Sequence, residues 1–193
     1  MILSDGLINN GFSLQDVNEN DLESYINIRR DCLKKYVDDY NGGWMEEIQV
    51  IIGTDNFHKM QTYTCFQKVL QNHRIVGFFT FAEQADRFGS IALQLMKSVR
   101  HMGLEAFYIS CITSLSREAD KPVFLHLYKS DPIQGLYKQF GFIIYDQSRT
   151  HYLMSFNQNA AVGINTADGF KNHGNHICGN FNLCGGVSRI SMH

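Results

Sequence analysis

Hydrophobic and polar positions repeat with two different periods along most of the chain. Apolar runs and alternations of the kind found in β-strands cover residues 12–17, 62–70, 75–81, 91–96, 123–128, 142–145 and 151–156. Apolar positions three and four residues apart predict helices over residues 22–37, 45–52, 104–115 and 133–140. The mixture predicts an α/β (mixed, α+β-like) domain over residues 11–156.

Local signals define several of the boundaries. Asn20, followed three residues later by Glu23, resembles a capping box, which predicts the start of the first long helix. That helix is expected to end before the loop of residues 38–43. The four residues 71–74 join two strands, which we expect to form an antiparallel hairpin, as we also expect of the final two strands.

The composition changes near residue 157. Residues 157–193 hold seven Asn and six Gly but only three charged residues, so we predict a mostly irregular C-terminal extension. Four of its side chains raise the question of zinc, namely His173, His176, Cys178 and Cys184. Because Cys-x5-Cys is not a usual ligand spacing, we predict no metal site.

Charge and cysteine content narrow the classes of partner. Seventeen basic residues against nineteen acidic ones give a formal charge of −2, so neither a nucleic acid nor a membrane is expected as a partner. Arg29 and Arg30 lie among acidic residues, which indicates a solvated mixed-charge helix face. Five cysteines, an odd set, suit a reducing compartment. With neither a long apolar run nor a signal-peptide pattern, the cytoplasm is the expected location.

The junction between the fourth strand and the next helix has the layout of an anion site. Residues 100–106 pass from the strand through Gly103 into the helix. The first amides of a helix have no partner within it and carry the positive end of its dipole, so a turn that exposes them can hold a phosphate. The alternative is a glycine that serves only the geometry of the turn.

One stretch of the chain resembles the fifth strand, fourth helix and final hairpin of the GCN5-related N-acetyltransferases (GNAT): KPVFLHLYKSDPIQGLYKQFGFIIYD, residues 121–146. The resemblance extends over about residues 11–156. It implies a GNAT-type single domain with a mostly antiparallel mixed sheet, splayed parallel strands 4 and 5, and about four flanking helices.

The family's acetyl-CoA signature is matched in part. Arg100 and Gly103 match it, whereas Glu105 stands where the family has Gly or Ala, and Ala106 comes one place late. The resemblance implies acetyl-CoA as co-substrate, with its pantetheine arm between strands 4 and 5. The implied contacts are Leu95, Met96, Lys97, Arg100, His101, Met102, Gly103, Leu104, Glu105 and Ala106.

Two further positions take roles from the resemblance. Tyr137 maps onto the family's tyrosine, which would protonate the departing CoA thiolate as general acid. By spacing alone, Tyr137 would be a core aromatic residue on an amphipathic helix. Asp131 stands where the family commonly has an Asn that contacts the cofactor, and with Pro132 after it, Asp131 also suits a helix cap.

The acceptor amine must lose a proton before it attacks, so a carboxylate or a His should face the reacting centre. The candidates are Glu46, Glu47, Glu83 and His126, with a proton relay through solvent as the alternative. We name Glu83 as the catalytic partner of Tyr137. Trp44 and Glu47 are the leading acceptor contacts, because a carboxylate beside an aromatic face suits an ammonium group, and His126 joins them.

The predicted function is acetyl transfer from acetyl-CoA to a primary amine, on a small molecule or a peptide, by direct attack in a ternary complex. The alternative is a catalytically degenerate GNAT-like module that binds CoA or a peptide. Lys97, His101 and Glu105 motivate this alternative, because all three depart from the family's usual residues in the cofactor loop. Whether the chain forms a homodimer is left open.

Overall fold

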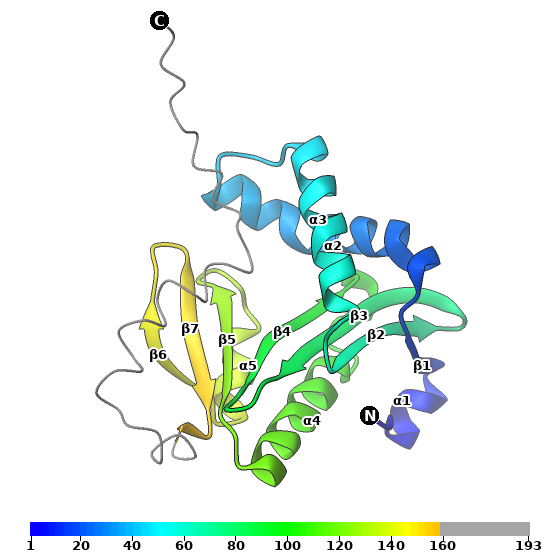
Figure 1. The fold of residues 1–193 in the computed structure, drawn as a ribbon. Coiled ribbons are helices and arrows are strands. Elements are labelled where there is room, and N and C mark those ends of the chain that lie inside the picture. The colour runs from blue at the N-terminus through cyan, green and yellow to red at the C-terminus, as the bar shows by residue number, and fades with distance from the viewer. Residues whose placement is uncertain (159–193) are drawn as a thin grey trace, which may run out of the picture. The chain divides into compact units, whose positions relative to one another are not determined.

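The structure is a computed structural model that describes residues 1–158 (Figure 1). The strands are β1 (Phe12–Asp16), β2 (Cys65–Gln71), β3 (Arg74–Glu83), β4 (Phe88–Leu95), β5 (Val123–Tyr128), β6 (Ile143–Gln147) and β7 (His151–Phe156). The α-helices are α1 (Asp5–Asn9), α2 (Leu22–Tyr40), α3 (Glu46–Met60), α4 (Leu104–Ala119) and α5 (Gln134–Gln139). Two short 3-10 helices are η1 (Glu19–Asp21) and η2 (Lys97–Val99).

The seven strands form one mixed sheet in the order β1-β2-β3-β4-β5-β7-β6. Neighbouring strands pair antiparallel everywhere except between β4 and β5, which are parallel. The ladder between these two strands consists of one residue pair, Phe88 with Val123, near the start of each strand. The predicted fold class, including the splayed parallel pair, is therefore confirmed.

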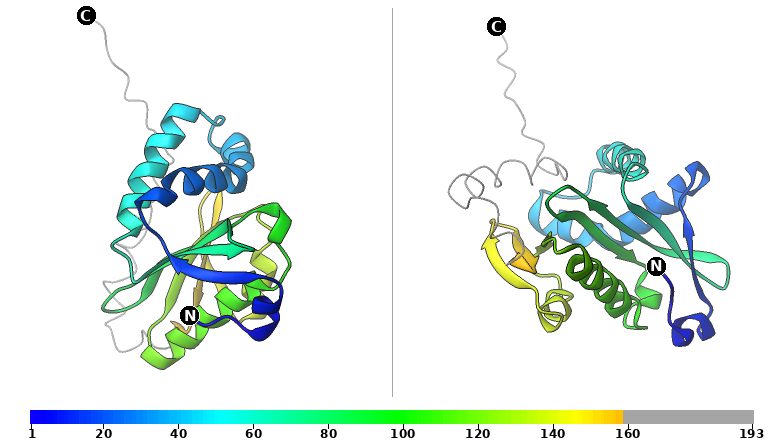
Figure 2. Two further views of the ribbon diagram at one scale, coloured as in Figure 1. Left: turned by 90° about the vertical axis from the view of Figure 1, so that its right-hand side faces the viewer. Right: turned by 60° about the horizontal axis from the view of Figure 1, so that its bottom comes forward.

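Helices cover both faces of the sheet (Figure 2). Strand β3 shows why, because successive side chains on a strand point to opposite faces. Phe79 packs in the core cluster on the face of α4, beside Tyr108. Phe78 packs in the cluster on the opposite face, with Tyr25 of α2 and Phe57 of α3. The centre of the sheet, at β3, is thus buried on both sides.

Three predicted boundaries on the side of α2 and α3 are wrong. The first long helix continues through Asp38 and Asp39, since these residues pair with Lys34 and Lys35 one turn earlier. The cap is Asn18 rather than Asn20: the Asn18 side chain accepts from the Asn20 N–H at 3.0 Å. The next helix, predicted to end near residue 52, extends to Met60, whose side chain packs beside Tyr25.

The first ten residues also belong to the domain. Helix α1, which the sequence pattern did not predict, places Leu7 in the core cluster that contains Phe12 and Leu104, and Leu3 joins the same cluster from the segment before the helix. None of the helices within residues 1–158 combines the length and the apolarity that crossing a membrane requires.

Candidate active site

The parallel strands β4 and β5 are each held on their outer side but not along their shared side. Strand β4 pairs with β3 as far as Leu95, and β5 pairs with β7 over its whole length as far as Tyr128. Between β4 and β5, only Phe88 and Val123 pair. The strands therefore diverge from that closed end towards Leu95 and Tyr128, which we call the open end. Backbone groups that face this crevice are available to an extended ligand.

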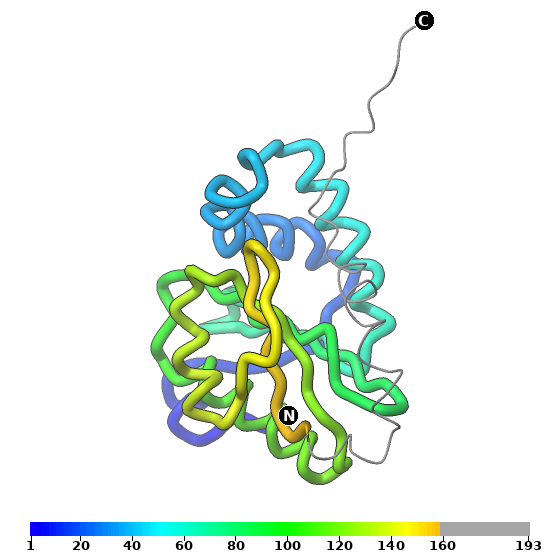
Figure 3. Tube along the Cα trace, turned by 90° about the vertical axis from the view of Figure 1, so that its left-hand side faces the viewer, coloured from blue at the N-terminus to red at the C-terminus, as the bar shows by residue number. Residues whose placement is uncertain are grey.

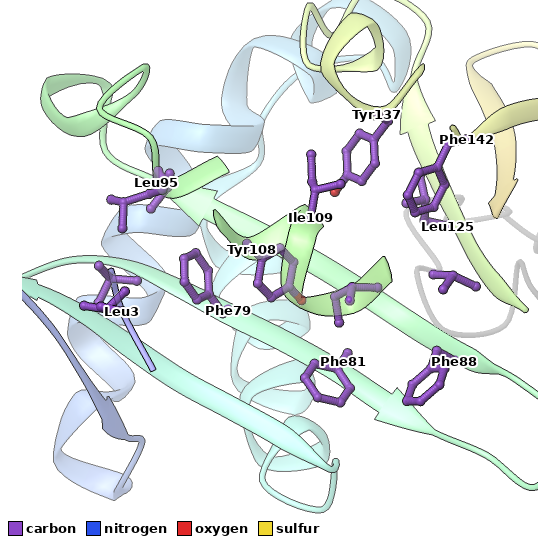
Figure 4. Packing of buried hydrophobic residues seen from close by; sticks show 14 of the residues in the cluster. Leu3, Phe79, Phe81, Phe88, Leu95, Tyr108, Ile109, Leu125, Tyr137 and Phe142 are labelled. Atoms are coloured by element: carbon purple, nitrogen blue, oxygen red, sulfur yellow. The ribbon is translucent and has the colours of Figure 1, made fainter. Parts of the chain in front are cut away.

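Tyr137 lies in the core on the side of α4 and α5. Its side chain is 3% exposed, and its ring packs edge-on against Phe142 with 5.1 Å between the centroids (Figure 4). Burial and the nearby carboxylate of Asp131 raise the pKa of Tyr137. The phenol therefore stays protonated at neutral pH and can donate a proton to a stronger base.

Arg100 reaches back to the end of β4. Its Nε donates to the Leu95 carbonyl oxygen at 3.0 Å, and its Nη2 lies 3.7 Å from the Cys32 Sγ of α2. The Cys32 thiol also approaches the Leu95 carbonyl, at 3.4 Å. Arg100, Cys32 and Leu95 thus form one polar cluster at the open end.

The two predicted contacts that follow Leu95 differ in their surroundings. The Met96 N–H donates to the Val76 carbonyl of β3 at 2.9 Å, so this amide is already paired within the sheet. Lys97 is exposed and begins η2. Of the predicted strand contacts, Leu95 alone combines a place at the end of β4 with the polar cluster of Arg100 and Cys32.

The predicted anion loop adopts the expected strand–turn–helix form. Gly103 precedes the first residue of α4 with φ of 95°, a left-handed conformation that favours glycine, and His101 also has a positive φ, of 65°. Met102 is exposed, and Leu104 is buried under the first turn. The loop therefore presents the N-terminus of a sixteen-residue helix.

One amide of this loop is occupied by the chain itself. The Glu105 Oε1 accepts from the His101 N–H at 2.9 Å, and Glu105 is 8% exposed. At the position where the resembled family has a small residue, this chain thus holds a carboxylate inside the loop. Ala106, one place later, is half-buried. The loop fits an anionic ligand with one amide fewer than the pattern predicts.

Asp131 lies in the turn before α5 rather than at its N-cap, which is Ile133 and carries no side-chain capping bond. Its Oδ1 accepts from the Ile133 N–H at 3.0 Å. Its carboxylate also faces Tyr36 of α2, and burial together with Asp131 raises the pKa of Tyr36 to about 12. Arg100 acts on Tyr36 in the opposite direction. Asp131 therefore links the start of α5 with the open end of the crevice.

The loop before α3, which carries the predicted acceptor contact Trp44, packs on α2 through that side chain. Its Nε1 donates to the Glu46 Oε2 at 2.8 Å, and the Arg29 guanidinium lies 5.6 Å from the centre of its ring. Glu46 also forms an ion pair with Arg30. The carboxylate that contacts Trp44 is thus that of Glu46, whereas Glu47, the predicted acceptor contact, is exposed on the first turn of α3.

Arg29 is not on the solvated face that the sequence pattern indicated. Its side chain is 1% exposed, whereas the neighbouring Arg30 is 37% exposed and pairs with Glu46. The difference arises because Arg29 falls on the stripe of α2 that faces α3. Its Nη1 donates to the Gln49 side-chain oxygen at 2.9 Å.

The predicted base candidates Glu83 and His126 lie in different parts of the domain. Glu83 is paired in register with Phe88 at the closed end, and its carboxylate lies 2.5 Å from the Lys121 Nζ. Because β4 rises about 3.3 Å per residue, the closed end lies roughly 20 Å from Leu95. Glu83 and Tyr137 are therefore not brought together at the open end.

His126 lies on β5, two residues before Tyr128 and on the same face of the strand. Its ring centre is 5.5 Å from that of His151 on β7. Burial lowers the pKa of His126, so the imidazole is neutral at pH 7 and able to accept a proton.

The structure adds three aromatic residues to the open end that sequence reasoning did not assign. The Tyr128 ring stacks on Tyr36 at 4.7 Å and on Tyr40 at 5.6 Å, both from α2. Figure 3 shows the turn between β6 and β7 close to α2, the helix that carries Tyr36 and Tyr40. Tyr36 stands at helical spacing from Cys32 and Leu33 on α2, which is a local signal for partial burial. No local signal indicated that the end of β5 would meet it.

A groove of about 1500 Å³ lies on the other face of the sheet, between α1, α4 and β2. It borders the cofactor loop at Met102, Gly103 and Ala106. The residues that line it do not include Trp44, Tyr128 or Arg29. The groove is therefore adjacent to the loop and separate from the acceptor side.

Within residues 1–158 no group of three or more His, Cys, Asp or Glu side chains is arranged to hold a metal ion. The two histidines and two cysteines of the C-terminal extension that raised the question of zinc lie outside the described residues.

Solved N-acetyltransferases share this fold. The PaiA N-acetyltransferase of Thermoplasma acidophilum, crystallised with coenzyme A, matches with a TM-score of 0.59 and 14% identity, over 75% of this chain and 97% of that chain. The N-acetyltransferase PseH of Campylobacter jejuni matches with a TM-score of 0.50 and 18% identity, over 77% and 99%. A GNAT-family protein from Desulfovibrio desulfuricans matches with 0.56 and 9%, over 75% and 98%.

No sequence-family model matches the chain, and neither does any curated protein. At identities of 9–18%, the structural likeness establishes the fold. The chain therefore has the fold of the GCN5-related N-acetyltransferases, and the resemblance seen in residues 121–146 is confirmed at the level of the fold.

Proposed function

We propose that this protein is an N-acetyltransferase that moves an acetyl group from acetyl-CoA to a primary amine by direct attack in a ternary complex. One observation carries the proposal: β4 and β5 diverge after a single residue pair, and Arg100 donates to the Leu95 carbonyl where β4 ends. The fold likeness to N-acetyltransferases supports it.

The chain would hold the co-substrate at two places. The end of β4 at Leu95 offers backbone groups to the pantetheine arm, and Arg100 and Cys32 would exchange their present contacts with the Leu95 carbonyl for contacts with the ligand. The loop from His101 to Leu104 offers the N-terminus of α4 to the pyrophosphate.

The reaction requires two proton transfers: the acceptor amine loses a proton, and the departing thiolate gains one. The neutral amine forms a bond to the thioester carbonyl carbon, and the carbon–sulfur bond then breaks. Tyr137 donates its proton to the departing thiolate, a role usually good for about 10²- to 10⁴-fold in rate. Among the base candidates we favour His126, because it is neutral at pH 7 and lies on the strand that forms the open end.

Thermal stabilisation by CoA, followed by a thiol-release assay with a panel of primary amines, tests the proposal. A ligand that binds only the folded protein raises the melting temperature with its concentration. We expect stabilisation by CoA, and with at least one amine we expect turnover that falls at least about 10²-fold in Tyr137→Phe. Tyr145→Phe is the matched control, because Tyr145 lies on the edge strand β6, where it packs against Phe124 of β5.

Absence of stabilisation by CoA would remove the proposal. Tyr137→Phe turnover equal to that of the wild type would remove the role of Tyr137 while leaving acetyl transfer in place.

The second candidate function is a CoA-binding module without turnover. Glu105 favours it, since its carboxylate occupies an amide that the pyrophosphate would otherwise use. The same experiments separate the two candidates: stabilisation by CoA with no thiol release from any amine would support the module.

A further inference from the structure

Arg29 is a buried cation whose partners account for only part of its hydrogen-bonding capacity. Its Nη1 donates to the Gln49 side-chain oxygen at 2.9 Å and approaches the Gln49 carbonyl at 3.4 Å. Its Nε and Nη2 are buried and have no hydrogen-bond partner within residues 1–158. Over the same residues, no carboxylate lies within 4 Å of the guanidinium.

Such a group is costly in a folded protein. Removing a charge from water without an opposite charge costs several kcal/mol, and each unpaired buried donor adds to this cost. Burial lowers the pKa of Arg29, but a guanidinium does not release its proton in proteins. Arg29 therefore stays positively charged, and an anion bound beside it would supply the missing opposite charge.

The unpaired atoms define the shape of that anion. In the planar guanidinium, the Nε–H and the outer Nη2–H point in the same direction along one edge. Two parallel N–H groups of this kind match the two oxygens of a carboxylate in a bidentate pair. The other edge is directed at Gln49, so the free edge is the one that binds carboxylates side-on.

Arg29 is close to the open end of the crevice. It precedes Cys32 by three residues of α2, about 4.5 Å along the helix axis, and the Cys32 Sγ lies 3.4 Å from the Leu95 carbonyl. The hydroxyl groups of Tyr25 and Tyr128 are near enough to act on the charge of Arg29. Arg29 therefore lies about one helical turn along α2 from the contact between Cys32 and the Leu95 carbonyl.

A second buried atom without a partner is found on the same side. The Gln94 Oε1 on β4 has no hydrogen-bond partner within the described residues, and its side chain contacts the Tyr25 hydroxyl. Arg29 offers donors and Gln94 offers an acceptor, with Tyr25 between them. This pattern complements a ligand that carries both an acidic group and an amine.

Trp44 covers this region from the solvent side, with its ring 5.6 Å from the Arg29 guanidinium. The ring is half-buried, and the loop that carries it contains Gly42 and Gly43, both with positive φ and with open space around them. The Arg29 Nε faces α3, where it lies 3.9 Å from the position that a Cβ atom would take at Gly53.

We propose that Arg29 binds the carboxylate of the acceptor, so that the amine acetylated by this protein belongs to an amino acid. The inference rests on the proposed function and names its substrate class. A carboxylate is favoured over a phosphate because a single cation with one free edge balances one negative charge. Arg29 acts here as a specificity-determining residue.

The test uses the full chain and three probe pairs: glycine with methylamine, β-alanine with ethylamine, and 4-aminobutanoate with propylamine. The corresponding aminoalkylphosphonates are tested as a third set of acceptors, beside the carboxylates and the plain amines. Thermal stabilisation by each probe without acetyl-CoA measures binding, and thiol release with acetyl-CoA measures kcat/KM. Because the first readout needs no turnover, failure of the inference is distinguishable from failure of the proposed function.

We expect at least one carboxylate probe to exceed its matched amine in kcat/KM by about tenfold or more, which is about 1.4 kcal/mol. Arg29→Met should bring this ratio close to one, and Arg29→Lys should also lower it, since an ammonium lacks the planar fork. Arg30→Met is the matched control and should keep the wild-type ratio, because Arg30 is exposed and pairs with Glu46.

Ligand-free stability separates binding from a structural role. If Arg29 is kept for an absent anion, Arg29→Met should not lower the melting temperature, since it removes an unpaired buried charge. If that variant does not fold, the purely structural role is supported and the inference is overturned. The inference is equally overturned by equal use of both members of every pair, by an unchanged ratio in both Arg29 variants, or by preference for the phosphonates.

Discussion

The two ends of the β4–β5 crevice differ in almost every physical respect. At the closed end the Phe88 N–H donates to the Pro122 carbonyl at 2.8 Å, Phe88 packs against Phe81, and Lys121 pairs with Glu83 (Figure 4). At the open end the strands separate, and polar groups replace apolar ones. Arg100 and Cys32 there share a single carbonyl acceptor, that of Leu95.

This difference shows how the domain separates stability from ligand binding. At the closed end, one residue pair and the packing of buried aromatic rings hold the two halves of the sheet together. Near the other end, Arg29 and Gln94 keep buried polar atoms without hydrogen-bond partners within residues 1–158. Under the proposed function, such groups would gain partners from a ligand.

The largest effect is expected from Phe88→Ala at the closed end. Phe88 is 2% exposed, and truncation of a buried Phe typically costs about 3–5 kcal/mol. Chemical denaturation should show this loss, whereas Ile144→Ala on the half-exposed edge strand should cost under about 0.5 kcal/mol. A Phe88→Ala variant with wild-type stability and abolished CoA binding would reverse the roles assigned to the two ends.

A smaller effect is expected from Glu105→Ala in the cofactor loop. Removing the carboxylate frees the His101 N–H and withdraws a negative charge from the path of the pyrophosphate. Titration should show CoA binding at least about tenfold tighter, or about 1.4 kcal/mol. Glu118→Ala, at the other end of the same helix, is the control. Weaker binding in Glu105→Ala would mean that the carboxylate orders the loop for its ligand.

The smallest effect concerns the two histidines at the open end. Burial lowers the pKa of His126, and burial with His126 as neighbour lowers that of His151 to about 4. Between pH 6.5 and 4 the unfolded chain therefore binds protons that the folded one does not, so stability falls as the pH falls. After allowance for solvent screening, His151→Asn should remove about 1 kcal/mol of this dependence in melting experiments.

The control for that experiment is His58→Asn. His58 is exposed on α3 and lies 3.4 Å from Glu19. Equal pH profiles for the wild type and His151→Asn would show that the histidine pair does not contribute.

Much of the fold could be read from local patterns. The period of α4 predicted its start at Leu104, and the final hairpin appears close to the residues expected for it. The extension of α2 through Asp39 was missed, because consecutive aspartates before two glycines resemble a loop. In the structure, ion pairs one turn apart stabilise the helix there.

The candidate site was predictable only in part. The strand–glycine–helix layout and the Tyr137 helix were visible from spacing and from the resemblance of residues 121–146. The positions of Glu83 and Trp44 were not, since each depends on which distant segment it meets. Arg29 lay on the stripe of apolar positions along α2, and this was the available signal that it is buried.

The sequence by itself determined the periodic elements, the turns between them and the charge at each position, because these depend on residues close together in the chain. The tertiary structure decided where β4 and β5 separate and which side chains meet at the opening. It also decided that Arg29 is enclosed while Arg30 remains in solvent. The physical reason is that burial and unsatisfied hydrogen bonds depend on contacts between α2, α3 and the sheet, which no local pattern specifies.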